Sequence, residues 1–198
     1  KTVEAVHQDF GMNYDDILVT DLKLQARDIK LIGDSLDFDL KHLSCVEKSG
    51  FVLKDFVAHS WITNKQWGLK DVNIVSTNSN LKAEHLYFSY IAGQGYWAKF
   101  TKKMQLDFQL NSSRISFLDL AYFNEKLLGF RESGKISGKV YGTIYDLRGR
   151  NIDIVYGSNT NFKGKFYMNG LPYLRDSYLE ADFKKLTTSI PDIEKVYI

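Results

Sequence analysis

Proline is almost absent from this sequence, which contains only Pro172 and Pro191 among 198 residues. Because proline removes a hydrogen bond from a β-ladder, its scarcity allows long uninterrupted strands. Long apolar runs are also missing, and none approaches the roughly 20 residues that a membrane-spanning helix needs. The single cysteine, Cys45, excludes an intramolecular disulfide and leaves the redox compartment open.

An excess of charge of either sign is lacking as well. The 26 lysine and arginine residues nearly balance the 24 acidic residues, and both kinds are interspersed along the chain. Proteins that bind nucleic acid usually concentrate basic residues in a patch or stripe, so we expect no nucleic-acid partner. A hydrophobic content of 44% with 14% aromatic residues argues against an intrinsically disordered chain.

Sequence motifs for catalysis and metal binding are also missing. Asp37 and Asp39 lie two residues apart on the polar face of a predicted strand, which favours a solvated surface over acid–base chemistry. No nucleophile has a recognisable base beside it in the sequence. No His-x-x-x-His or Cys-x-x-Cys pair occurs, and the four histidines are far apart: His7, His42, His59 and His85. We therefore predict no enzyme, no metal site and no cofactor.

What the sequence does contain is alternation of apolar and polar residues, the period of a β-strand. The clearest run takes every second position over 136–144: Ile136, Gly138, Val140, Gly142 and Ile144. A polar turn is expected at 148–150, followed by further strands of an antiparallel meander over 152–156 and 162–168. Other alternating runs lie at 36–40, 104–110 and 179–183, and Gly93–Gly95 is expected to form a turn.

Helices are expected to be few and short. One is predicted over 117–128 and another from Ile190 onward, where Pro191 falls in the first turn and Ser189 and Asp192 have capping spacing. Glycines at 138, 142 and 164 are expected to permit curvature and to leave room on the apolar face. The predicted fold class is therefore all-β with short helices, in an elongated, curved antiparallel sheet.

The chain also shows internal similarity, the sign of a repeat protein. Three alternating segments match in order: Leu36–Ser44, Met104–Ser112 and Leu179–Thr187. A second pair, 72–83 and 152–164, lies between them, and Ile115, Leu118 and Tyr122 align with Ile190, Ile193 and Tyr197. We predict units at 46–123 and 124–198, with 1–45 as the end of a preceding unit, and expect an internal segment of a longer protein.

Through Glu47–Phe51, Gly68–Leu81 and Gly134–Gly170, the sequence resembles the AsmA-like family, and within it the long TamB proteins (translocation and assembly module subunits) of diderm bacteria. The resemblance covers most of the chain from about Leu36 onward, and Lys1–Asp34 is expected to pack differently. It implies a periplasmic segment of a protein anchored in the inner membrane elsewhere in its chain. It also implies a folded-over sheet with an apolar interior and a role in outer-membrane biogenesis. The implied partners are a phospholipid or another acyl-chain lipid and an outer-membrane assembly protein of the TamA/BamA type.

Three hypotheses for the function remain open at this point. The first is an apolar groove for phospholipid transport between the inner and outer membranes. The second is a scaffold that assembles outer-membrane β-barrel proteins by β-augmentation, and the third is a closed β-sandwich binding module. For the first, the predicted lining residues are Val72, Ile74, Met104, Leu106, Phe108, Ile136, Val140, Ile144, Ile152, Ile154, Phe162, Phe166, Leu179 and Phe183.

Overall fold

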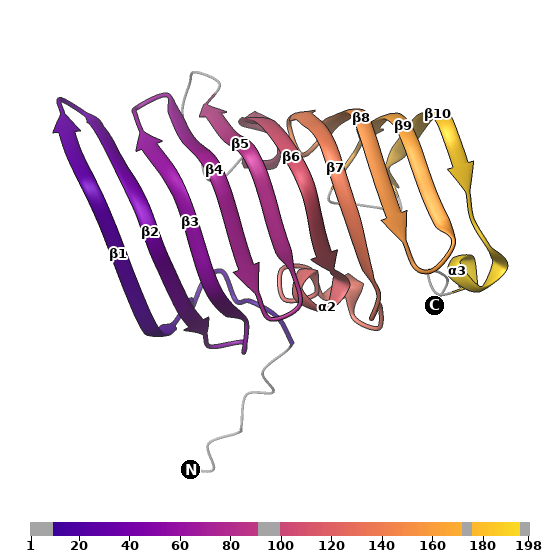
Figure 1. Ribbon diagram of the computed structural model, residues 1–198, viewed down its shortest axis with the longest axis horizontal. Helices are drawn as coiled ribbons and strands as arrows, with labels where there is room; N and C mark the ends of the chain where they lie inside the picture. Colours follow the sequence, from indigo (N-terminus) through magenta and orange to yellow (C-terminus); the bar gives the residue numbers. More distant parts are fainter. Residues whose placement is uncertain (1–9, 91–99, 172–175, 195–198) are drawn as a thin grey trace, which may run out of the picture.

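The computed structural model describes residues 10–90, 100–171 and 176–194, and these residues form one antiparallel sheet of ten strands. The strand order in space follows the order in sequence, so each strand pairs with its neighbours in the chain (Figure 1). This confirms the prediction of an all-β antiparallel meander. The strands are β1 (Val19–Ile32), β2 (Ser35–Glu47), β3 (Val52–Ile62), β4 (Gln66–Ser76), β5 (Asn80–Tyr90), β6 (Met104–Ser116), β7 (Ser133–Gly142), β8 (Asp146–Tyr156), β9 (Thr160–Asn169) and β10 (Tyr178–Thr187).

The helices are short, as expected, but one prediction is wrong in extent. Instead of a helix over 117–128, the chain forms two separate turns, α2 (Phe117–Leu120) and η2 (Glu125–Leu127). The segment between them is held by other contacts, because the Tyr122 carbonyl accepts a hydrogen bond from the Met12 N–H at 2.7 Å. The remaining helices are α1 (Phe100–Lys103) and α3 (Ile190–Glu194), which begins where the sequence predicted it.

Within the described residues, no helix has the length and apolar character that crossing a membrane requires. Three sequence features lie outside the described residues and are not placed by the structure: His7, the expected turn Gly93–Gly95, and Tyr197. The N-terminal region that was expected to pack differently contributes β1 to the same sheet, where β1 pairs with β2.

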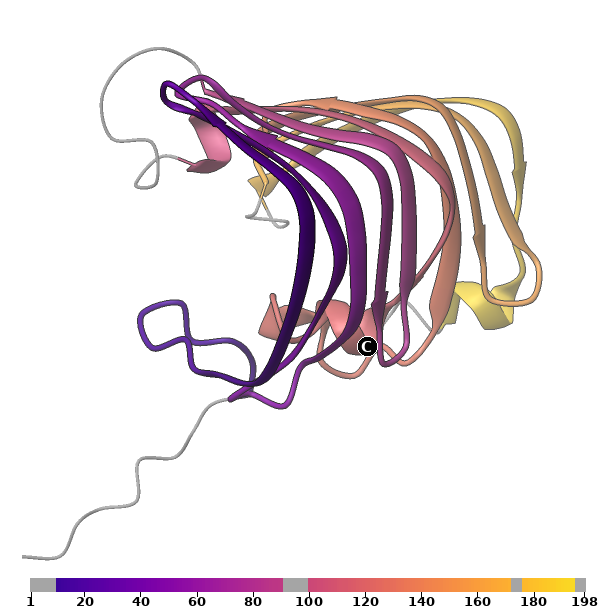
Figure 2. The same ribbon diagram turned by 60° about the vertical axis from the view of Figure 1, so that its left-hand side comes forward.

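The strands bend along their length, so that the sheet has a concave and a convex face (Figure 2). Register shifts interrupt the ladders near mid-strand, between β3 and β4, β7 and β8, β8 and β9, and β9 and β10. At two of these shifts a residue takes the left-handed conformation, Asp71 with φ 51° and Asn151 with φ 50°. Because a β-bulge bends its strand, a row of bulges across the sheet accounts for the curvature.

The glycines do not create room on the concave face, and that part of the prediction is wrong. A Cβ atom on Gly138 would lie 2.5 Å from the Asn151 carbonyl oxygen, and one on Gly164 would lie 2.1 Å from the Asp182 carbonyl oxygen. Gly138 and Gly142 also have positive φ values of 123° and 108°. Glycine is required at these positions because the neighbouring backbone fills the space that a side chain would need.

The predicted turn at 148–150 is also wrong, because these residues lie inside β8. The turn comes earlier, where the Thr143 N–H donates to the Asp146 carbonyl at 2.9 Å and the Thr143 Oγ1 accepts from the Asp146 N–H at 3.0 Å. Ile144 therefore lies in the turn and not in a strand. Gly149 looks like a turn residue in the sequence, but in the sheet the Phe166 ring occupies the space over it.

Two buried aspartates make the same kind of contact in two places. Asp119, at α2, accepts hydrogen bonds from the N–H and side-chain amide of Asn78 in the β4–β5 turn, at 3.1 and 2.9 Å. Asp192, at α3, accepts from the N–H groups of Ser158 and Asn159 in the β8–β9 turn, at 3.2 and 2.8 Å. Each contact ties a short helix to a turn at the same rim of the sheet (Figure 1).

These contacts change the alignment of the repeat. Asp119 and Asp192 are 73 residues apart, whereas the sequence alignment of Ile115 with Ile190 used an offset of 75. Strand pairing supports the shorter offset. Leu106 of β6 pairs with Phe88 of β5 as Leu179 of β10 pairs with Met168 of β9, and Leu106 and Leu179 are also 73 residues apart. The unit boundaries at 46–123 and 124–198 stay a prediction.

Candidate functional site

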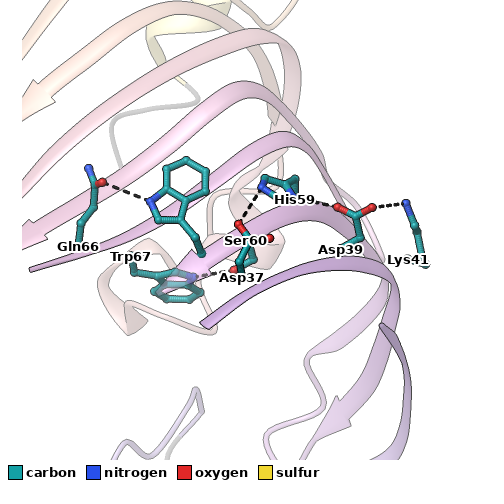
Figure 3. Close-up of polar contacts among 8 residues, drawn as sticks. Asp37, Asp39, Lys41, His59, Ser60, Gln66 and Trp67 are labelled. Atoms are coloured by element: carbon teal, nitrogen blue, oxygen red, sulfur yellow. Dashed lines mark hydrogen bonds and ion pairs between the residues drawn. The ribbon is translucent and has the colours of Figure 1, made fainter. Parts of the chain in front are cut away.

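The two faces of the sheet differ in chemistry. Successive side chains of a strand point to opposite faces of the sheet. Trp61 pairs with Gly68 and Trp67 pairs with Ile62 on the adjacent strand, so the two tryptophans point to opposite faces. Figure 3 shows Asp39 and Lys41 outside the curve of the sheet, whereas Trp67 lies on the side that the sheet encloses. The convex face is therefore the charged face, and the concave face carries the apolar side chains.

Rows of apolar residues cross the concave face from strand to strand. One row is defined by successive ladder pairs from β4 to β10 and consists of Leu69, Leu86, Phe108, Val140, Gly149, Phe166 and Ala181. A neighbouring row from β4 to β7 consists of Val72, Ala83, Leu110 and Gly138. Aromatic rings pack along these rows, with Phe88 5.0 Å from Phe108 and 5.4 Å from Trp67 between ring centroids. The concave face is thus one continuous apolar surface.

Register places every predicted lining residue on this face except Ile144, which lies in the β7–β8 turn. The structure therefore brings together these residues from six strands, β4 and β6–β10: Val72, Ile74, Met104, Leu106, Phe108, Ile136, Val140, Ile152, Ile154, Phe162, Phe166, Leu179 and Phe183.

Exposure increases from the centre of the concave face to its two ends. Leu69 and Leu86 in the central strands are 4% and 6% exposed. In the edge strands, Leu31 of β1 is 76% exposed and Leu179 of β10 is 59% exposed. Central side chains bury one another because a concave surface brings them together, whereas β1 and β10 have a neighbouring strand on one side only among the described residues.

Sequence reasoning missed several residues of this face, because bulges change the phase of alternation. Leu69 and Val72 point to the same face although they are three residues apart, since Asp71 occupies a bulge between them. In β5 a register shift between Ala83 and His85 likewise moves Leu86 and Phe88 onto the apolar face. A search for apolar residues three apart across polar residues, as across Asp71 and across Glu84, would have found them.

One rim of the concave face is bordered by the segment around α2. The rings of Phe10 and Phe51 pack against Tyr122 at centroid distances of 5.0 and 5.7 Å, and Phe51 also contacts Phe123 at 5.0 Å.

Burial of Asp119, in α2, acts to raise the pKa of its carboxyl group. Hydrogen bonds from Ser76, Ser79 and Asn78 outweigh that effect and hold the pKa of Asp119 below its ordinary value.

On the convex face, the described histidines pair with aspartates on neighbouring strands. His59 contacts Asp39 at 2.8 Å and Asp37 at 3.4 Å (Figure 3). His85 contacts Asp107 at 3.1 Å. Hydrogen bonds from Lys41 and His59 lower the pKa of Asp39 below its ordinary value. The interpretation of Asp37 and Asp39 as a polar surface therefore agrees with their ion-paired positions.

A third histidine makes contacts that the sequence did not suggest. His42 Nδ1 lies 2.7 Å from Asp55 Oδ1, and His42 Nε2 lies 3.0 Å from Ser44 Oγ. This order of groups is that of a serine nucleophile with its base and orienting acid. Its side chains stand on an open strand surface, where those of His42 and Asp55 are 32% and 36% exposed. Hydrolysis also requires oxyanion donors and a bound substrate, so the three residues alone do not define a catalytic site.

Comparison of the chain with protein-family models, with curated proteins and with solved structures yields no match. The two faces of the sheet and the resemblance of the sequence to the AsmA-like family are therefore the grounds for a proposed function.

Proposed function

We propose that this protein binds the acyl chains of phospholipids, or of similar lipids, along its concave face and performs no catalysis. The observation that supports this proposal is the apolar surface of the concave face. One row of ladder pairs on that face crosses all ten strands and consists of Leu31, Leu36, Ile62, Trp67, Phe88, Leu106, Gly142, Leu147, Met168 and Leu179. A face of this kind, left to solvent, is unusual unless it has an apolar partner.

The energetic basis of the proposal is the cost of exposing acyl chains to water. At about 0.8 kcal/mol per methylene, a two-chain lipid carries a transfer penalty on the order of 20 kcal/mol. A carrier reduces this penalty only if apolar contact continues along the path of the lipid. The row from Leu31 to Leu179 meets this requirement, because each of the ten strands contributes one residue of that row to the same face.

The resemblance to the AsmA-like family suggests where this activity belongs. We place it in the periplasm of a diderm bacterium, in transport of phospholipid between the inner and outer membranes, as part of a TamB-like protein anchored in the inner membrane. A TamA/BamA-type protein is the corresponding outer-membrane partner. These assignments depend on the residues that carry the resemblance, 47–51, 68–81 and 134–170.

A second candidate function, a scaffold for outer-membrane β-barrel proteins, has one observation in its favour. β1 and β10 each pair with only one neighbour within the described residues, so each has an edge available for β-augmentation. In that function the affinity would come from backbone pairing at an edge, and acyl chains would not be needed.

Photo-crosslinking tests the lipid proposal with controls on the same strands. A photoreactive amino acid is placed at Val140 or Phe166 on the concave face, and in matched variants at Tyr141 or Tyr167 on the convex face. Delipidated protein is then incubated with vesicles that contain radiolabelled phosphatidylethanolamine. We expect crosslinks to lipid from Val140 and Phe166 and background levels from Tyr141 and Tyr167. Equal labelling of both faces, or none from the concave face, contradicts the proposal.

A further inference from the structure

The convex face is hollowed where the bulges of β8, β9 and β10 lie side by side. A register shift interrupts the β8–β9 ladder between Gly149 and Ile152, and another interrupts the β9–β10 ladder between Phe183 and Lys185. A bulge bends its strand, so side chains on the outer side of the bend spread apart. The space between them, called here the β8–β10 depression, has a volume of about 250 Å³. It is lined by Arg150, Asn151, Gly164, Lys165, Asp182 and Lys184.

Charge in the β8–β10 depression is not balanced. Three of its residues are cations and one, Asp182, is an anion, which leaves a net charge of +2. Lys165 Nζ lies 3.1 Å from Asp182 Oδ2, so the carboxylate is already paired. Neither Arg150 nor Lys184 takes part in an ion pair among the described residues. Cations that lie together without an equal number of counter-charges attract an anion.

The Arg150 side chain is held in place by an aromatic ring. Its guanidinium carbon lies 5.3 Å from the centroid of the Tyr141 ring on β7. Arg148, on the same strand, makes the equivalent contact with Tyr167 on β9 at 5.3 Å. A guanidinium that stacks on a ring by its face keeps the N–H groups at its edges available for hydrogen bonds. Arg150 is therefore an oriented donor at the border of the depression.

The first half of the sheet has a similar depression of opposite charge. It lies on β4–β6, and its charged lining residues, Asp71, Lys82 and Glu84, give a net charge of −1. Asp71 and Asn151 hold the same place in the two depressions, because each takes the left-handed conformation at a bulge, with φ values of 51° and 50°. A bulge on the convex face therefore does not require positive charge around it. The positive charge is particular to the β8–β10 depression.

We propose that the β8–β10 depression binds a phosphate group, either as the free anion or at the end of an organic phosphomonoester. A phosphomonoester carries a charge of about −1.5 to −2 at pH 7, which matches the net charge of the site. Arg150 donates to two of its oxygens in bidentate geometry, and Lys165 and Lys184 supply further charged donors. The site lies on the convex face, so this inference does not depend on lipid binding along the concave face.

A titration of isotope-labelled protein followed by NMR tests this proposal. Inorganic phosphate is added in one arm and glycerol phosphate in the other. We expect saturable shifts of the amide signals around Arg150, Lys165 and Lys184, and none around Asp71. Equal affinity in the two arms identifies the free anion as sufficient, whereas tighter binding of glycerol phosphate identifies an organic phosphomonoester as the ligand.

Charge-removing variants determine whether binding depends on this depression. Arg150→Gln with Lys184→Gln should weaken binding about tenfold or more, because two charge-assisted interactions are lost. Lys70→Gln with Lys82→Gln removes the same charge from exposed positions of β4 and β5 and should leave the affinity unchanged. Asp182→Asn removes the competing carboxylate beside Lys165 and should tighten binding severalfold.

Three results would overturn the proposal. The first is the lack of a saturable shift at about ten millimolar ligand, where even a weak site would be filled. The second is equal weakening by the two double variants, which would show that only the overall charge matters. The third is weaker binding after Asp182→Asn. Circular dichroism of every variant separates loss of the site from loss of the fold.

Discussion

The prediction that tests the architecture most directly concerns Asp119. This carboxylate is 4% exposed and accepts hydrogen bonds from the Asn78 N–H, the Asn78 side-chain amide and the Ser76 hydroxyl. Asp119→Asn keeps the shape of the side chain, removes its charge and halves its accepting capacity. Hydrogen bonds to a charged group contribute roughly 1.5–3 kcal/mol each, and a buried donor left unpaired costs about 1–3 kcal/mol. We expect the free energy of unfolding to fall by about 2 kcal/mol.

Urea unfolding followed by circular dichroism measures this change, and pH supplies an internal check. The pKa of Asp119 is lowered in the folded protein, so its contribution is present above the unfolded carboxyl pKa of about 3.9 and is lost as pH falls through the lower folded value. The difference between wild type and Asp119→Asn should therefore be full at pH 7 and shrink in strong acid.

Two further variants decide whether the reasoning holds. Asp192→Asn removes the equivalent carboxylate at α3. Asp119 binds the β4–β5 turn and Asp192 binds the β8–β9 turn, so the effects should add in the double variant. Asp55→Asn, at a partly exposed carboxylate on the convex face, is the control and should change stability little. A loss below about 0.5 kcal/mol for Asp119→Asn, against the magnitude expected for its hydrogen bonds, would refute the role assigned to these contacts.

Three other predictions follow from the sheet. Gly138→Ala should destabilise the protein by about 2 kcal/mol or more, because its Cβ would meet the Asn151 carbonyl, whereas Gly134→Ala should change little; urea unfolding compares them. Leu86→Ala should cost roughly 2–5 kcal/mol in the same assay and exposed Leu179→Ala under about 1 kcal/mol. A fluorophosphonate probe should leave Ser44 unmodified as judged by intact-protein mass spectrometry, and labelling that disappears in Ser44→Ala would show a reactive serine and contradict the non-enzymatic proposal.

Alternation in the sequence was sufficient to assign the fold class and most of the concave face. It succeeded at 136–142 and 162–168, where each strand keeps a strict period of two. It failed where a bulge adds a residue, as at Asp71, because the apolar positions then lie three apart. A single-sequence pattern does not locate bulges, since Asp and Asn in the left-handed conformation look like turn residues.

Glycine misled the prediction in a different way. Gly149 between two arginines has the composition of a turn, yet the Phe166 ring covers it in the middle of a sheet. That contact comes from β9 and is set by register, which tertiary structure determines. Likewise, the contact of Asp55 with His42 depends on the pairing of β2 with β3, so spacing along the chain could not reveal the chain of contacts from Asp55 through His42 to Ser44.

The same alternation describes both a closed sandwich core and an open concave face, and the distribution of exposure separates them. In a closed core, a second layer would cover the apolar side chains of edge strands as well as those of central strands. Here Leu69 is buried by its neighbours on adjacent strands, while Leu31 and Leu179, on the same face, remain exposed at the two ends. Burial therefore comes from curvature within one sheet. An apolar partner therefore gains most by contacting side chains that remain exposed on this face, such as Leu31 and Leu179.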